Sequence, residues 1–132
     1  ILLIALGVSS CSKDDDDNTP AELARKWEYA QQGAVLMGQE ILQPYTHEEG
    51  CSKDFMVLSA STVADHSFIG TACTEDIETS NYTRNGNTLT MMVDGEMETA
   101  EIVQLDNTTL KIKVTENFEG QSVGYLTVFT RK

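Results

Sequence analysis

Apolar and polar residues alternate along much of the chain after residue 53, and this period of two is typical of β-strands that bury one face. The strictest alternation runs from residue 110 to 115, where Leu110, Ile112 and Val114 share one face and polar residues share the other. Short runs rich in β-branched and aromatic residues occupy 54–58, 66–70, 81–84, 88–93, 97–105 and 124–130. These runs predict a succession of strands, and residues 27–29 predict an earlier one.

Turn-forming residue pairs separate the predicted strands. Asn85-Gly86 is a favoured pair for a two-residue type I′ hairpin, in which both central residues need a positive φ. Asp94-Gly95, Asp106-Asn107 and Glu119-Gly120 mark further turns. Residues 34–42 fit either a strand or a helix, and residues 21–26 predict a short helical turn before the first strand.

About eight strands follow from this pattern, joined by connections of hairpin length. Strands and helices do not alternate, so a parallel α/β sheet is disfavoured. Consecutive antiparallel strands with one buried face form either a sandwich or an up-and-down barrel. A sandwich needs longer cross-connections for its Greek keys, so the sequence predicts an all-β fold, a small antiparallel up-and-down barrel.

The first eleven residues indicate secretion. Residues 1–8 form an apolar run that is too short to span a bilayer, and Ser9-Ser10-Cys11 follows it. This is the layout of a signal peptide without its initial Met and basic region, so we expect the sequence to begin inside one, at residues 1–10. A cysteine at that place resembles the lipobox of bacterial lipoproteins, in which the thiol receives a diacylglyceryl group. A core strand that ends in a buried cysteine is the alternative, but the polar residues 12–20 continue no packed element.

Residues 11–20 are expected to be a lipidated cysteine followed by an extended acidic tether. The residues after Cys11 resemble the export signal of surface lipoproteins in Bacteroidetes, carried here by Lys13, Asp14, Asp15, Asp16 and Asp17. The expected location is therefore the outer membrane, lipid-anchored and facing the cell surface, with the periplasmic leaflet as the alternative.

The acidic composition of the chain disfavours two classes of binding partner. The 132 residues include 21 acidic and 9 basic ones, which gives a net charge of −12. Nucleic-acid binders normally carry a basic patch, and so do proteins held electrostatically on anionic lipids, so both classes are disfavoured. Apolar residues make up 40% of the chain, which is enough for one buried core.

Several segments of the chain resemble the lipocalin-like domain of Bacteroidetes lipoproteins. The resemblance covers residues 21–132 and rests on the order and spacing of the segments at 51–55, 73, 82–90, 99–105, 109–112 and 125–129. Leu23 to Trp27 stands where these domains carry a Gly-x-Trp signature, although Arg25 replaces the usual glycine. The resemblance implies a small lipocalin-like barrel over residues 21–132, a fold able to hold an apolar ligand.

The chain has three cysteines, and two remain to pair with each other once Cys11 is assigned to the lipid. Cys51 and Cys73 are then expected to form a disulfide in an oxidising compartment, and the family resemblance supports the same pair. A redox-active site needs a Cys-x-x-Cys motif or an electropositive setting, and Glu48, Glu49 and Asp54 surround Cys51 instead.

Catalytic and metal sites find little support in the sequence. His47 and His66 lack a second histidine at helical spacing and are expected to be polar loop or strand residues rather than metal ligands. Glu96, Glu98 and Glu101 lie close together, but a solvated acidic face explains them better than a glycosidase pair. Motifs for cofactors or nucleophiles are not found, so we expect a protein that is not an enzyme and has no cofactor.

Apolar side chains inside an eight-stranded barrel either fill it or line a ligand pocket. The residues expected to face inward and to line any pocket are Trp27, Tyr29, Phe55, Phe68, Leu89, Met91, Ile102, Leu110, Ile112, Val114 and Tyr125. The expected function is therefore binding of a small apolar or amphipathic ligand. The alternative is a solid barrel that docks an unidentified protein in an envelope complex.

Overall fold

The computed structural model describes residues 22–131 as one nine-stranded antiparallel sheet, and it contains no helix in that range. Consequently, no helix in the described part of the chain is suited to crossing a membrane. The strands are β2 (Lys26–Leu36), β3 (Gln39–Pro44), β4 (Phe55–Leu58), β5 (Thr62–Ile69), β6 (Thr74–Asn85), β7 (Thr88–Val93), β8 (Glu96–Leu105), β9 (Thr109–Phe118) and β10 (Gln121–Arg131).

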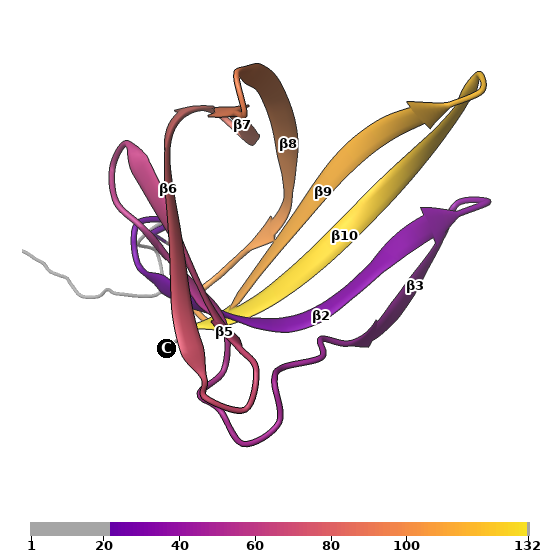
Figure 1. Cartoon of the computed structure of the whole chain (residues 1–132). Helices are drawn as coiled ribbons and strands as arrows, with labels where there is room; N and C mark the ends of the chain where they lie inside the picture. Colours follow the sequence, from indigo (N-terminus) through magenta and orange to yellow (C-terminus); the bar gives the residue numbers. More distant parts are fainter. Residues whose placement is uncertain (1–21, 132) are drawn as a thin grey trace, which may run out of the picture.

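Eight of these strands close into a barrel, because β10 pairs with β2 as well as with β9. The remaining strand, β3, extends the sheet beside the end of β2 (Figure 1). The start of β2 pairs with β4 and its end pairs with β3, so β3 and β4 follow one another along the same edge. The predicted all-β barrel is confirmed, and residues 34–42 form a strand hairpin. The predicted helical turn begins outside the described residues and stays a prediction.

Hairpin turns form at residue pairs that the sequence predicts, except at Asn85-Gly86. Met37-Gly38, Asp94-Gly95 and Glu119-Gly120 have positive φ at both residues, as the type I′ turn requires. At the hairpin predicted for Asn85-Gly86, Asn85 pairs with Thr88 as part of the ladder. Gly86 and Asn87 therefore form the turn, and only Gly86 has a positive φ, so the predicted type I′ geometry is wrong there.

The core occupies the end of the barrel where β2 begins and β10 ends. It is a cluster of side chains that are almost fully buried: Leu23, Trp27, Met56, Leu58, Tyr82, Leu89, Ala100, Ile102, Leu110 and Phe129. Burying that many large apolar groups is the main stabilising contribution to the fold, at about 1.5–3 kcal/mol for each Leu, Ile or Phe side chain.

The predicted disulfide is present between Cys51 and Cys73, with an S–S distance of 2.00 Å. It joins the segment between β3 and β4 to the turn between β5 and β6. The Gly70 N–H in the same turn donates to Glu48 Oε1 over 3.0 Å. Together these bonds hold residues 45–54 against the open end of the barrel wall.

Gly33 marks a close approach of β3 to β2. A Cβ atom at this position would lie only 1.8 Å from the Ile41 carbonyl oxygen, so the backbone has room for glycine alone. Beyond this point the β2–β3 and β9–β10 hairpins lean away from the β7–β8 hairpin, as Figure 1 shows. The barrel is therefore packed at one end and splayed at the other.

Candidate functional site

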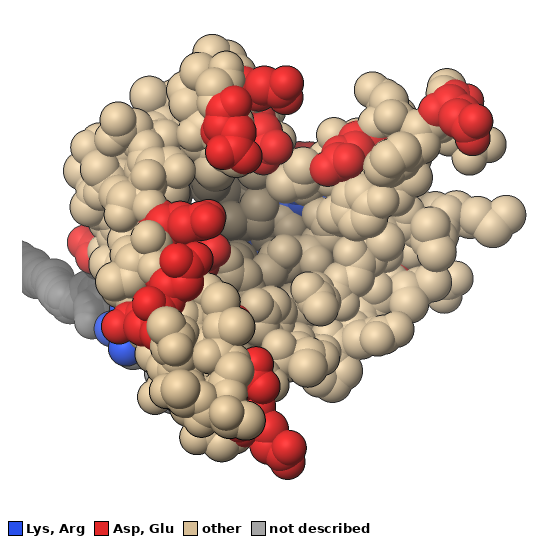
Figure 2. All heavy atoms as spheres, viewed as in Figure 1, with Lys and Arg blue, Asp and Glu red and all other residues tan. Residues whose placement is uncertain are grey.

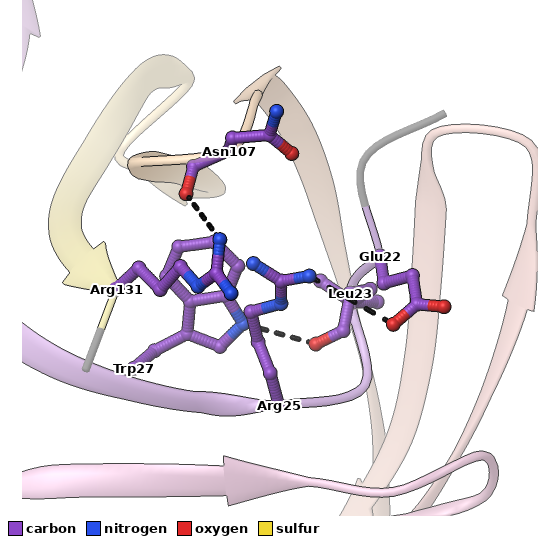
Figure 3. Close-up of polar contacts among 6 residues, drawn as sticks. All are labelled: Glu22, Leu23, Arg25, Trp27, Asn107 and Arg131. Atoms are coloured by element: carbon purple, nitrogen blue, oxygen red, sulfur yellow. Dashed lines mark hydrogen bonds and ion pairs between the residues drawn. The ribbon is translucent and has the colours of Figure 1, made fainter. Parts of the chain in front are cut away.

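The closed end is sealed by Trp27, whose side chain is 0% exposed. Its indole N–H donates to the Leu23 carbonyl over 2.9 Å. The Arg25 guanidinium lies 5.8 Å from the indole centroid and pairs with Glu22 at 3.8 Å, while Arg131 donates to the Asn107 carbonyl over 3.5 Å (Figure 3). A ligand therefore has no route through this end of the barrel.

The interior becomes less buried toward the other end. Tyr29, Met91, Ile112 and Val114 pack against the core but keep part of their surface exposed. Figure 2 shows a hollow in the molecule, viewed along the same direction as Figure 1. The barrel is therefore filled by the core at one end, and it is open, with an apolar wall, at the other.

Asp65 places a carboxyl group on this interior wall. It pairs across the sheet with Met56, which faces the core, so both side chains point inward. The Tyr29 hydroxyl donates to Asp65 Oδ1 over 2.8 Å. Burial raises the pKa of Asp65 above its ordinary value, and Asp54 and Asp76 add to the increase, although the Tyr29 hydrogen bond opposes it.

An aromatic row continues from the core to the wall around Asp65. The rings of Phe129 and Tyr29 lie 4.6 Å apart, those of Tyr29 and Tyr45 lie 4.7 Å apart, and those of Tyr45 and His47 lie 4.8 Å apart. The Tyr45 hydroxyl donates to Asp54 Oδ2 over 2.8 Å. Burial raises the pKa of both tyrosines, so their hydroxyls stay protonated, and the two rings offer a ligand aromatic faces with fixed hydroxyls.

Asp54 fixes the segment that carries Tyr45. Its side chain is buried, and Oδ1 accepts the Phe68 backbone N–H over 3.0 Å while Oδ2 accepts Tyr45. The Asp54 N–H in turn donates to His47 Nδ1 over 3.0 Å. His47 and Asp54 therefore stabilise the segment rather than bind an ion, and no cluster suited to a metal is present in residues 22–131.

Nine of the predicted inward-facing residues do face the interior. The strand registers place Trp27, Leu89, Ile102 and Leu110 in the buried core. The others lie toward the open end, namely Tyr29, Met91, Ile112, Val114 and Tyr125, and the last of these is 42% exposed. Only this second group is placed to touch a ligand.

Phe55 and Phe68 were expected to face inward, and this is wrong. Met56, the neighbour of Phe55, faces the core, so Phe55 points outward and stacks on His66 at 4.4 Å between ring centroids. Phe68 lies two residues after His66 on the same outer face. The Lys26 ammonium lies 4.0 Å from the Phe55 centroid, and this cation–π contact outside the barrel gives the ring a partner there.

Carboxylates surround the open end. Glu96 and Glu98 share one face, as expected, and their partners Val93 and Met91 show that this face is the interior one. Figure 2 shows acidic side chains on several sides of the hollow. Cys11 and the acidic residues Asp14–Asp17 with Lys13 lie outside the described residues, so the lipidation and export predictions are not tested here.

Comparison with protein families gives one match. Residues 12–112 match the family model described as a lipocalin-like domain. This range begins before the described residues and ends within β9, and it covers most of the chain. No curated protein sequence matches the chain.

Similar solved structures share the barrel at low sequence identity. A lipocalin-like protein from Bacteroides uniformis is 12% identical with a TM-score of 0.60, and the match covers 83% of this chain and 98% of that one. An uncharacterised protein from Bacteroides eggerthii is 9% identical with a TM-score of 0.57, covering 84% and 100% of the two chains. Bovine odorant binding protein, in complex with a selenium-containing odorant, is 15% identical with a TM-score of 0.51, covering 91% and 76%.

Proposed function

The chain belongs to the family of lipocalin-like domains, and on that premise we propose that it is a lipid-anchored envelope protein whose barrel binds a small apolar or amphipathic ligand. The observation that carries the binding proposal is the gradient of burial along the interior. Leu110 is 0% exposed at the closed end, whereas Ile112 and Val114 on the same face of β9 keep exposed surface. Such a wall is apolar, concave and open on one side, as ligand sites are.

The polar groups in the wall favour an amphipathic ligand. Asp65 and the hydroxyls of Tyr29 and Tyr45 lie beside apolar surface, so an alkyl chain fits against Ile112 and Val114 while a polar head reaches the carboxyl group. Bovine odorant binding protein, which shares the fold, has been solved with undecanal, a linear aldehyde. That likeness supports the chemical class of the ligand.

The anchoring part of the proposal rests on the sequence. An apolar run that ends in Ser9-Ser10-Cys11 is followed by acidic residues, and the barrel begins only at residue 26. Two or more acyl chains on one cysteine give stable anchoring, whereas a single chain gives only marginal binding. We place the barrel outside the outer membrane, with the periplasmic leaflet as the alternative.

A fluorescent probe tests the binding site. N-Phenyl-1-naphthylamine is neutral and apolar, and we expect its emission to rise on binding to the wild-type barrel and to fall when undecanal displaces it. Val114→Trp should fill the open interior and weaken probe binding at least tenfold. Val57→Trp is the matched control, because Val57 lies on the outer face of β4. Equal loss of binding in both variants, or none in either, would contradict a site inside the barrel.

A further inference from the structure

The seam between β8 and β9 is closed only in part. The two strands pair from Glu101 to Leu105 on β8 and from Leu110 to Lys113 on β9. The runs Glu96–Ala100 and Val114–Phe118 continue toward the open end but pair only with β7 and β10. Each run therefore presents an edge with unpaired backbone N–H and C=O groups, which is a template for an added strand.

Charge disfavours an extension of the seam toward the open end. The last pair at the fork, Glu101 and Lys113, has opposite charges, with 3.6 Å between Nζ and Oε1. If the same register continued, Glu98 would come to lie directly opposite Glu116. Like charges at opposed positions destabilise a β-ladder, and the structure gives neither carboxylate an ion pair among residues 22–131.

A groove lies at the fork of the seam. It has a volume of about 410 Å³, and the residues that line it are Asn87, Thr88, Thr99, Ala100, Glu101, Lys113 and Thr115. Thr99 and Thr115 stand on opposite sides of the seam, and β-branched side chains suit a third strand placed between them. Figure 2 shows acidic side chains on both sides of the hollow, over the ends of β7 and β8 and over β9 and β10.

We propose that this seam binds an extended basic peptide segment of a partner protein as an added strand. The backbone of the peptide pairs with the free edge of β9 at Val114–Phe118, a run of five residues that spans roughly 17 Å. Alternate lysine or arginine side chains point toward the interior, where they neutralise Glu98 and Glu116. Small or β-branched residues lie between them and face Thr99 and Thr115 on the outside.

Charge favours this occupant over others. The net charge of −12 attracts basic partners and repels a second copy of the chain. The lysine or arginine side chains also place positive charge between Glu98 and Glu116, which a direct β8–β9 pairing in the same register would bring together. This interaction surface adjoins the apolar wall proposed for the ligand and shares Val114 with it, but its backbone edge and its carboxylates Glu98 and Glu116 are not used by that ligand.

The test uses a blocked seven-residue peptide that alternates lysine with threonine, at near-physiological salt to screen unspecific attraction. We expect binding by titration calorimetry, together with slower hydrogen exchange of the amides at 114–118. Glu98→Lys should weaken binding at least tenfold, because it places opposite charges across the seam and lets the barrel close. Glu49→Lys makes the same charge change in the segment between β3 and β4 and should alter the affinity less than twofold.

Three results would overturn the proposal. The first is equal weakening by both variants, which would indicate attraction to net charge alone. The second is undiminished binding of a peptide whose alternate backbone nitrogens are methylated, because such a peptide cannot form the ladder. The third is a concentration-dependent dimer protected at 96–100 and 114–118, which would make a second copy the occupant. A thermal melt of each variant establishes that it is folded.

Discussion

The ionisation of Asp65 is coupled to the fold. Burial raises its pKa, so the folded barrel holds the proton more tightly than the unfolded chain does. The carboxyl groups of Asp54 and Asp76 act in the same direction, and the Tyr29 hydrogen bond and His66 act against it. Its contribution to stability is therefore complete below the ordinary pKa of an aspartic acid and is lost as the pH rises through the raised value.

Asp65→Asn removes this pH dependence while keeping an oxygen that accepts the Tyr29 hydroxyl. We expect the melting temperature of the variant, relative to the wild type, to be higher at pH 7 than at pH 3 by about 2–4 °C, allowing for partial exposure of the site. Asp94→Asn, in the exposed turn between β7 and β8, is the control and should give the same difference at both pH values. Parallel pH profiles for the wild type and Asp65→Asn would contradict the assigned coupling.

Among the elements, the strands with the clearest alternation were predicted best. Leu110, Ile112 and Val114 face the interior as expected, because one face of β9 is consistently apolar. The register of β4 and β5 was wrong by one residue, since an aromatic ring at Phe55 looked like a core residue while Met56 took that place. An outward ring needs partners such as His66 and Lys26, and those contacts depend on strand pairing that no local pattern gives.

The polar wall and the open seam could not be predicted from the sequence either, because they too depend on which strands are neighbours. Tyr29 and Asp65 are 36 residues apart in the sequence, and their hydrogen bond exists only because β2, β4 and β5 are neighbours. That Glu98 and Glu116 would be opposed in an extended seam likewise follows only from the register of β8 on β9. The disulfide was predictable, because only two cysteines remained after Cys11 was assigned to the lipid.

The segment between β3 and β4 depends on that disulfide. Replacing Cys51 and Cys73 by serine should destabilise the barrel by roughly 3 kcal/mol, the entropy of closing a loop of this length, and lower the melting temperature by about 10 °C or more. Hydrogen exchange should increase first in residues 45–54, which the bond ties to the turn at Gly70. Unchanged melting, or two free thiols from these cysteines in the unreduced wild type, would contradict this assignment.

In the whole molecule, one end of the barrel provides stability and the other end provides the candidate binding surfaces. The closed end holds the core around Trp27 and the arginines beside it, and it supplies the stability. The open end is less well packed and has less strand pairing, and the exposed apolar wall, the partly buried Asp65 and the free strand edges lie there. Parts of a fold that are less well packed in this way are where binding sites commonly lie.

Native mass spectrometry of the protein extracted from its own membrane tests the central claim most directly. The account predicts a covalent mass that matches a chain beginning at Cys11 and carrying a diacylglyceryl group. It also predicts a second, non-covalent adduct of small-molecule mass that is released on gentle activation and is missing from Val114→Trp. An unmodified chain without a bound adduct, from both the wild type and the variant, would contradict a lipid-anchored barrel that carries a ligand.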